Sequence, residues 1–171
     1  MNGSIYEREL AGILSGSPNV LEKLSKRLDD ESRSAIGTLK EKPFYVARAA
    51  GSLGADIIAL RHDYSMVIEV KSSINPTITF TEASGMRQEQ AERLQQKCLK
   101  SGLFIIYAFR LKNAQGDPWR MFSLPGEPKG RMRFLYNMLS EISQSRNGNY
   151  VLKWNEGVPL SKMVDYLNQT I

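Results

Sequence analysis

The chain has 171 residues, 42% of them hydrophobic, and its 23 Lys and Arg residues against 18 Asp and Glu residues give a net charge of +5. This length suits one domain with a buried core, and the positive charge favours a polyanionic partner such as nucleic acid. One cysteine, Cys98, and one histidine, His62, exclude a disulfide framework, a histidine-ligated metal and Ser-His-Asp or Cys-His catalysis. We expect a single domain over residues 1–171, with Cys98 as a core thiol. No signal peptide or apolar run of membrane length is visible, so we expect a cytoplasmic protein without a membrane partner.

The first quarter of the chain is predicted to be helical. Apolar residues at helical spacing predict a helix over residues 4–14, and Ser4 and Glu7 have the form of a capping box at its start. Leucines at helical spacing follow a Ser-Gly-Ser-Pro break. We therefore expect an inserted helical segment over about residues 15–43 that packs on the core or on a partner.

The remaining elements are predicted to alternate between strands and helices. We expect a nearly all-apolar central strand over residues 103–109, and an edge strand over residues 119–123. The order of the elements favours an α/β fold with a central mixed β-sheet flanked by helices. The other predicted strands cover residues 45–48, 56–61 and 66–71, and the other predicted helices cover residues 84–100, a segment with Met132, Leu135, Leu139 and Ile142, and residues 160–167.

The strands over 56–61 and 66–71 are predicted to form a hairpin that carries two carboxylates and a lysine. A turn centred between His62 and Asp63 places Asp56 directly across from Glu69, where two like charges destabilise a sheet unless a cation lies between them. Because side chains alternate along a strand, Glu69 and Lys71 share a face opposite to Met66, Ile68 and Val70, which form the buried face.

This arrangement suits metal-assisted hydrolysis of a phosphodiester. Carboxylate oxygens favour Mg²⁺ or Mn²⁺, and a water bound to such an ion becomes a usable nucleophile near neutral pH. Lys71 would orient that water or offset charge in the transition state. The alternative is structural, because Glu and Lys two positions apart often form a solvated strand face and Asp56 is also a common type of turn residue.

The same motif, Asp56 followed by Glu69-x-Lys71, resembles the signature of the PD-(D/E)xK nuclease superfamily, with Ala55 in place of the usual proline. Within that superfamily, the chain is most similar to the archaeal Holliday junction resolvase family. The segments that carry this resemblance, in order, are Gly3-Ser4-Ile5-Tyr6-Glu7-Arg8-Glu9-Leu10, Val46-Ala47-Arg48-Ala49-Ala50-Gly51-Ser52, Asp56-Ile57-Ile58-Ala59-Leu60, Ile68-Glu69-Val70-Lys71-Ser72, Arg87-Gln88-Glu89-Gln90-Ala91-Glu92 and Gly148-Asn149-Tyr150-Val151.

The resemblance implies a restriction-endonuclease-like core and a set of site residues. Glu7 would be the third metal ligand beside Asp56 and Glu69, although the capping box offers it a rival role. Glu9 is the runner-up position and is expected on a solvated helix face. DNA contacts are implied at Arg8, Arg48, Ser52, Arg87 and Gln90, where a plain turn for Ser52 and a solvated helix for Gln90 are the alternatives.

The function implied is a Mg²⁺-dependent endodeoxyribonuclease, with Mn²⁺ able to substitute, that resolves four-way DNA junctions by paired incisions in recombination and repair. The near two-fold symmetry of a junction favours a homodimer. Two alternatives stay open at this point: another PD-(D/E)xK endonuclease of repair or restriction type, and a catalytically silent DNA-binding module that keeps the fold.

Overall fold

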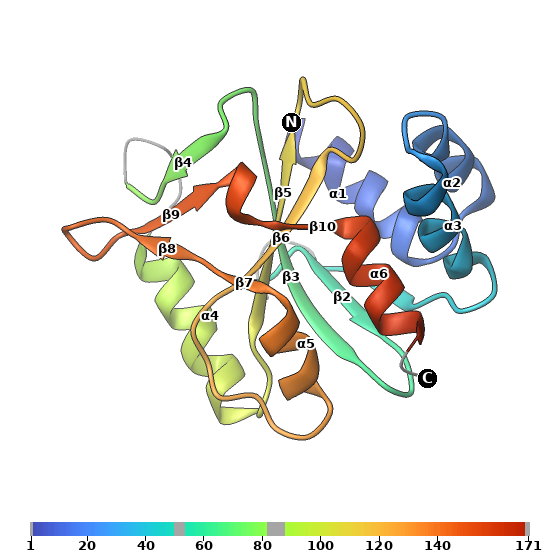
Figure 1. Ribbon diagram of the computed structural model, residues 1–171. Helices are drawn as coiled ribbons and strands as arrows, with labels where there is room; N and C mark the ends of the chain where they lie inside the picture. Colours follow the sequence, from blue (N-terminus) through green and yellow to red (C-terminus); the bar gives the residue numbers. More distant parts are fainter. Residues whose placement is uncertain (1, 50–53, 82–87, 170–171) are drawn as a thin grey trace.

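The computed structural model describes residues 2–49, 54–81 and 88–169 (Figure 1). Ser52 and Arg87, two of the expected DNA contacts, lie outside the described residues. The helices are α1 (Asn2–Leu14), α2 (Pro18–Ser25), α3 (Asp30–Gly37), α4 (Gln88–Lys100), α5 (Met132–Met138) and α6 (Leu160–Gln169), with short 3₁₀ turns at Thr38–Lys40 and Trp154–Glu156. The strands are β1 (Tyr45–Arg48), β2 (Ile57–Leu60), β3 (Ser65–Ser73), β4 (Thr77–Thr79), β5 (Ile105–Leu111), β6 (Trp119–Ser123), β7 (Ser140–Glu141), β8 (Ser143–Gln144), β9 (Tyr150–Lys153) and β10 (Val158–Pro159).

The main sheet is mixed, and its strands run in the order β1-β2-β3-β5-β6-β10, with β7 also paired to β6. The strands β1, β2 and β3 are antiparallel neighbours, whereas β3 and β5 are parallel and are joined through α4. This topology confirms the predicted α/β class with a central mixed sheet. The nearly all-apolar segment predicted to lie centrally is β5, whose first six residues are buried.

Helices cover both faces of the main sheet. On one face, α1, α2, α3 and α6 pack against the side that carries Ile57, Met66, Ile68 and Ile106 (Figure 1). On the other face, α4 and the small sheet β4-β9-β8 enclose a second apolar cluster with Tyr107 and other residues of β5. The alternation of side chains along β3 and β5 supplies both clusters from the same strands.

The inserted segment forms α2 and α3, which pack on the core of this chain. Leu21 and Leu24 of α2 and Ile36 of α3 are buried, so the predicted amphipathic pattern is present. The helices α1 and α2 approach closely at Gly12, where an added Cβ would lie 2.7 Å from Val20 Cγ2. The absence of a side chain at Gly12 is therefore what allows α2 to lie against α1.

Three local predictions are wrong. The helix α1 begins at Asn2, so Ser4 lies inside its first turn and cannot be the N-cap of a capping box. The strand β6 is not an edge strand, because β10 and β7 pair with it on the side away from β5. The predicted helix that included Ile142 ends at Met138, since the chain turns there into the short strands β7 and β8.

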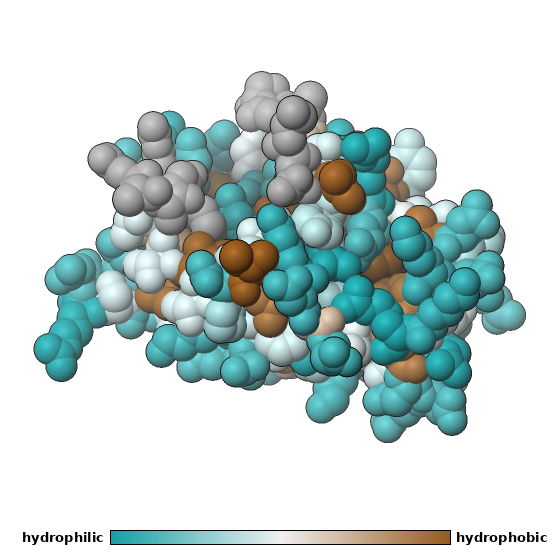
Figure 2. Space-filling view, turned by 90° about the horizontal axis from the view of Figure 1, so that it is seen from above, coloured by the Kyte–Doolittle hydropathy of each residue, from teal (hydrophilic) through white to brown (hydrophobic). Residues whose placement is uncertain are grey.

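The surface is largely polar. The face seen in Figure 2 is mainly hydrophilic, with hydrophobic residues in small groups. The large apolar side chains that are exposed, such as Tyr45 at 77% and Ile74 at 64%, lie far apart in the chain. Within the described ranges, no helix combines the length and the apolar content that crossing a bilayer requires.

Candidate active site

The β2–β3 hairpin places Asp56 and Glu69 together as predicted. Ile57 pairs with Ile68, which is the register that puts the preceding Asp56 across from Glu69. Two hydrogen bonds with backbone groups of β3 hold Asp56 in place. The Asp56 N–H donates to Ile68 O at 3.1 Å, and Asp56 Oδ2 accepts from the Val70 N–H at 2.7 Å. A carboxylate held by a backbone donor on the neighbouring strand is preorganised for a ligand.

The alternation predicted for β3 is also observed. Met66, Ile68 and Val70 are buried in the core, whereas Glu69 and Lys71 lie on the other face with 15% and 27% of their side chains exposed. The Lys71 ammonium lies 3.9 Å from Glu69 Oε2. The two carboxylates and the lysine therefore form one partly open group on the face of the sheet that α4 covers.

Glu69 is held in an environment that opposes its negative charge. Burial, the negative charge of Asp56, the hydrogen bond with Asp56 and the charge of Glu7 together raise the pKa of Glu69 from 4.5 to about 8, although the Lys71 ammonium opposes the increase. Two carboxyl groups this close cannot both ionise freely in a protein without a cation between them. In the absence of a cation, the pair therefore retains a proton near neutral pH.

Glu7 lies close enough to affect Glu69 but is engaged elsewhere. Its Oε2 accepts a hydrogen bond from Arg48 Nη2 at 3.2 Å, an ion pair that joins α1 to β1. In the described part of the chain, no three acidic, histidine or cysteine residues are close enough to one another to form a metal cage. The structure thus brings Asp56 and Glu69 together and leaves Glu7 at the side, paired with one of the expected DNA contacts.

The expectation for Glu9 is wrong. Its Oε1 accepts from Arg110 Nε at 3.0 Å and from Trp119 Nε1 at 2.8 Å, with 24% of the side chain exposed. Residues two apart on a helix point about 200° apart, so Glu9 faces away from Glu7. The sequence gives no sign of these bonds, because Arg110 and Trp119 lie on distant strands.

The other expected DNA contacts are distributed over two elements. Arg8 is exposed on α1, and its guanidinium donates to the carbonyl and hydroxyl oxygens of Ser4 at 3.3 Å. Gln90 is exposed in the first turn of α4, whose buried face is formed by Ala91, Leu94 and Cys98. This places Gln90 on the solvated side, where its exposure agrees with a DNA contact as well as with a solvated helix.

Tyr107 is a site residue that the sequence did not reveal. On β5 it is the direct neighbour of Glu69 on β3, and its ring packs edge-on against Phe80 with centroids 5.2 Å apart. Burial and the charges of Glu69 and Asp56 raise the pKa of its phenol, so Tyr107 stays neutral. Only the β3–β5 register could have identified this residue, because the two strands are separated by a helix in the chain.

The donor set fits a hard divalent cation. Mg²⁺ is held in proteins by one or two carboxylates together with waters and phosphate oxygens, and Asp56 and Glu69 supply two such groups. Burial and then the negative charge of Asp56 raise the pKa of Glu69, and a cation bound between the two carboxylates would favour their charged forms. The Lys71 ammonium does not replace such a cation, since it lies 3.9 Å from Glu69 Oε2.

Comparison with known proteins identifies the family. A family model described as archaeal Holliday junction resolvase matches residues 25–171. The structure is similar to that of a Holliday junction resolvase from the archaeal hyperthermophile Archaeoglobus fulgidus, with a TM-score of 0.50 and 18% sequence identity over 96% of each chain. At that identity, the likeness supports the fold alone. A comparison with curated proteins found no match. Since the family model covers most of the chain, the protein belongs to the archaeal Holliday junction resolvase family, whose members are nucleases.

Proposed function

We propose that this protein is a Mg²⁺-dependent endonuclease that resolves four-way DNA junctions by paired phosphodiester hydrolysis. The observation that carries the proposal is the group formed by Asp56, Glu69 and Lys71. Two carboxylates face each other across a hairpin, with an ammonium 3.9 Å from one of them. Membership of a family of junction resolvases supports this reaction and this substrate for the site.

Asp56 and Glu69 would hold the cation, with Glu7 as the third carboxylate beside them. The bound ion supplies an acidic water as nucleophile and stabilises negative charge on the phosphate, and Mn²⁺ is expected to substitute for Mg²⁺. The backbone N–H of Val70 keeps Asp56 in place for this role. Lys71 would orient the attacking water and stabilise the charge that develops on the phosphoryl oxygens.

The substrate is proposed to be a branched DNA junction, with a homodimer as the acting unit. A four-way junction is close to two-fold symmetric and needs two incisions, so a closed two-fold dimer places one site at each target strand. Arg8 and Arg48 extend the site on α1 and β1 as phosphate contacts. The net charge of +5 supports binding to DNA.

A cleavage assay on a labelled four-way junction tests the proposal. Linear duplex and flap substrates serve as controls, and each reaction is run with Mg²⁺, with Mn²⁺ and with chelator. We expect symmetric cuts that are confined to the junction and that need a metal. Cutting of duplex or flap would instead assign the protein to another kind of endonuclease.

The variant Asp56→Asn separates catalysis from binding. It removes one metal ligand but leaves the basic surface in place, so cleavage should be lost while junction binding survives. Asp30→Asn is the matched control, because the Asp30 side chain is fully exposed and remote in the fold from the hairpin. A wild-type protein that binds junctions and never cuts them would favour the silent binding module.

A further inference from the structure

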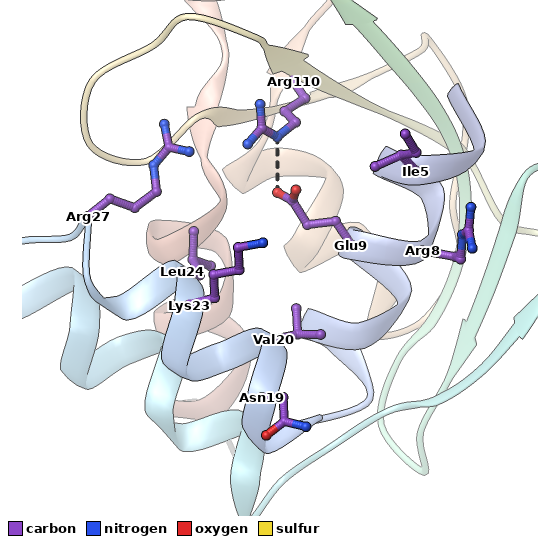
Figure 3. A pocket seen from close by; sticks show the side chains of 9 residues that line it. All are labelled: Ile5, Arg8, Glu9, Asn19, Val20, Lys23, Leu24, Arg27 and Arg110. Carbon is purple, nitrogen blue, oxygen red and sulfur yellow. Dashed lines mark hydrogen bonds and ion pairs between the residues drawn. The ribbon is translucent and has the colours of Figure 1, made fainter. Parts of the chain in front are cut away.

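A pocket of about 370 Å³ lies between α1, α2 and β5, behind the helix that carries Glu7 (Figure 3). Its volume is in the range of small-molecule sites. Ile5, Val20 and Leu24 give the pocket an apolar part, and the rest of its lining is mostly cationic, with Lys23, Arg27 and Arg110. A cavity with apolar and cationic lining suits an amphipathic anion.

Arg110 presents unused hydrogen-bond donors to this pocket. The residue is only 8% exposed, its guanidinium lies 4.5 Å above the Tyr6 ring, and its Nε donates to Glu9. Its Nη1 and Nη2 groups make no hydrogen bond to any described residue. Among the described residues, the buried side-chain polar atom without a partner is Ser123 Oγ, so these terminal donors of Arg110 are not sealed in the core but are accessible from the pocket.

Two further cations point into the same space (Figure 3). Arg27 uses Nη2 and Nε to hold the carbonyls of Ala114 and Gly116 at 2.6 and 3.0 Å, which fixes the guanidinium and leaves Nη1 without a bond to the described residues. Lys23 is exposed on α2, and no described carboxylate lies within 4 Å of its ammonium.

The charge of the pocket matches one kind of ligand. Four cations, Arg8, Lys23, Arg27 and Arg110, and one carboxylate, Glu9, line the pocket, so the net formal charge of the lining is 4 − 1 = +3. A phosphomonoester carries about −1.5 to −2 at pH 7 and offers three acceptor oxygens. A diester carries a single charge, and a carboxylate offers only two oxygens. The apolar side at Ile5, which is 53% exposed, leaves room for an organic group.

We propose that this pocket binds an organic phosphomonoester, with the phosphate on Lys23, Arg27 and Arg110 and the organic group against Ile5 and Leu24. Two sources share this chemistry: a free mononucleotide and the 5′-phosphate at a DNA end. The pocket and the carboxylate pair lie on different sides of α1, because Glu9 faces the pocket and Glu7 faces the pair, and Arg8 lines the pocket next to Glu9. The proposal therefore does not depend on the proposed cleavage reaction.

Calorimetric titration with deoxyadenosine 5′-monophosphate tests the pocket. Chelator is present throughout, so that the carboxylate pair carries no cation and repels phosphate. We expect saturable binding of the nucleotide, with deoxyadenosine and inorganic phosphate each at least about tenfold weaker, because each lacks one half of the ligand. Absence of nucleotide binding at millimolar concentration would overturn the proposal, and so would equal binding of inorganic phosphate.

Two variants with the same change of charge locate the binding. Lys23→Glu should weaken nucleotide binding by at least about tenfold, because it places a negative charge where the phosphate lies. Lys26→Glu, one helical turn further on and outside the pocket lining, should change it by less than about threefold, because an exposed charge at that distance is screened. Equal losses in the two variants would refute a specific site.

A second titration distinguishes the two sources. Short duplexes with and without a 5′-phosphate are compared on wild-type protein and on Lys23→Glu. A preference for the phosphorylated duplex that Lys23→Glu removes would assign the pocket to DNA ends. Equal binding of both duplexes, together with nucleotide binding that needs Lys23, would assign it to a free mononucleotide.

Discussion

Replacing Glu69 with glutamine should stabilise the protein when no metal is present. The pKa of Glu69 is raised from 4.5 to about 8 in the folded protein, first by burial and then by Asp56. A carboxyl group whose pKa is raised by folding stabilises the folded state fully when the pH is below its pKa in the unfolded chain. This stabilisation is lost as the pH rises through the pKa of the group in the folded protein. Wild-type stability should therefore fall between about pH 4.5 and pH 8. Glutamine has the same shape, stays neutral and can still donate a hydrogen bond to Asp56.

The size of this effect follows from the change in pKa. An increase from 4.5 to about 8 corresponds to an upper limit of about 5 kcal/mol at high pH. Movement of Lys71 toward the ionised pair lowers this limit, and we expect Glu69→Gln to gain about 2 to 4 kcal/mol at pH 8.5. For a domain of this size, such a gain raises the midpoint of thermal unfolding by about 5 to 15 °C. Near pH 4.5 the gain should be close to zero.

Thermal and urea unfolding in chelator, from pH 4.5 to 8.5, measure this difference. Glu22→Gln is the matched control, because Glu22 is exposed on α2 and its loss removes the same charge. A gain for Glu69→Gln that is the same at every pH, or no gain at pH 8.5, would refute the electrostatic reasoning. Addition of Mg²⁺ should stabilise the wild type more than the variant, since binding of a ligand to the folded state alone adds stability.

Three further substitutions test other parts of the structure by urea unfolding. Asp63→Ala should lower the free energy of unfolding by about 3–5 kcal/mol, because it leaves Arg61, whose side chain is 7% exposed, without its ion-pair partner at 2.7 Å. A loss below about 1 kcal/mol would show that water hydrates the Arg61 guanidinium in the variant. Gly157→Ala should cost about 1–3 kcal/mol, because the new Cβ would lie 2.6 Å from Phe122 Cζ, whereas Gly37→Ala meets nothing within 4 Å and should not destabilise. Arg48→Ala should change stability by less than about 1 kcal/mol, because its ion pair on α1 is solvent-exposed; junction binding, measured by titration at low salt, should weaken if Arg48 contacts phosphate.

The parts of the fold that the sequence predicts are those fixed over short distances. The β2–β3 register follows from a four-residue turn, residues 61–64, and from alternation that buries Met66 and Ile68, since a slip by one residue would expose both. Asp56 and Glu69 meet for that reason alone. The pairings of β6 with β10 and of β4 with β9 join segments that are far apart in the chain, and no periodicity encodes such partners.

The same difference between local and long-range contacts explains why some predictions for the site residues hold and others do not. The spacing of Ser4 and Glu7 predicts a capping box as the rival to a metal-binding role for Glu7, but helical structure continues back to Asn2, and Glu7 bonds with Arg48 across the fold. The expected exposure of Glu9 failed for a similar reason, since its partners lie on β5 and β6. A local pattern identifies an acid, and only the tertiary fold decides what the acid contacts.

Helix α1 is the element that separates the two sites. Its Glu7 faces the hairpin carboxylates and its Glu9 faces the cationic pocket, so a substitution on α1 can disturb both sites at once. Helix α2 lines the pocket and packs on α1 and α3, and it reaches α1 because Gly12 has no side chain. Variants on α2 such as Lys23→Glu should therefore leave the pKa of Glu69 and metal-dependent cleavage of a saturating substrate unchanged. A change in either would mean that α1 moves when the pocket is altered, and the two sites would have to be treated as coupled.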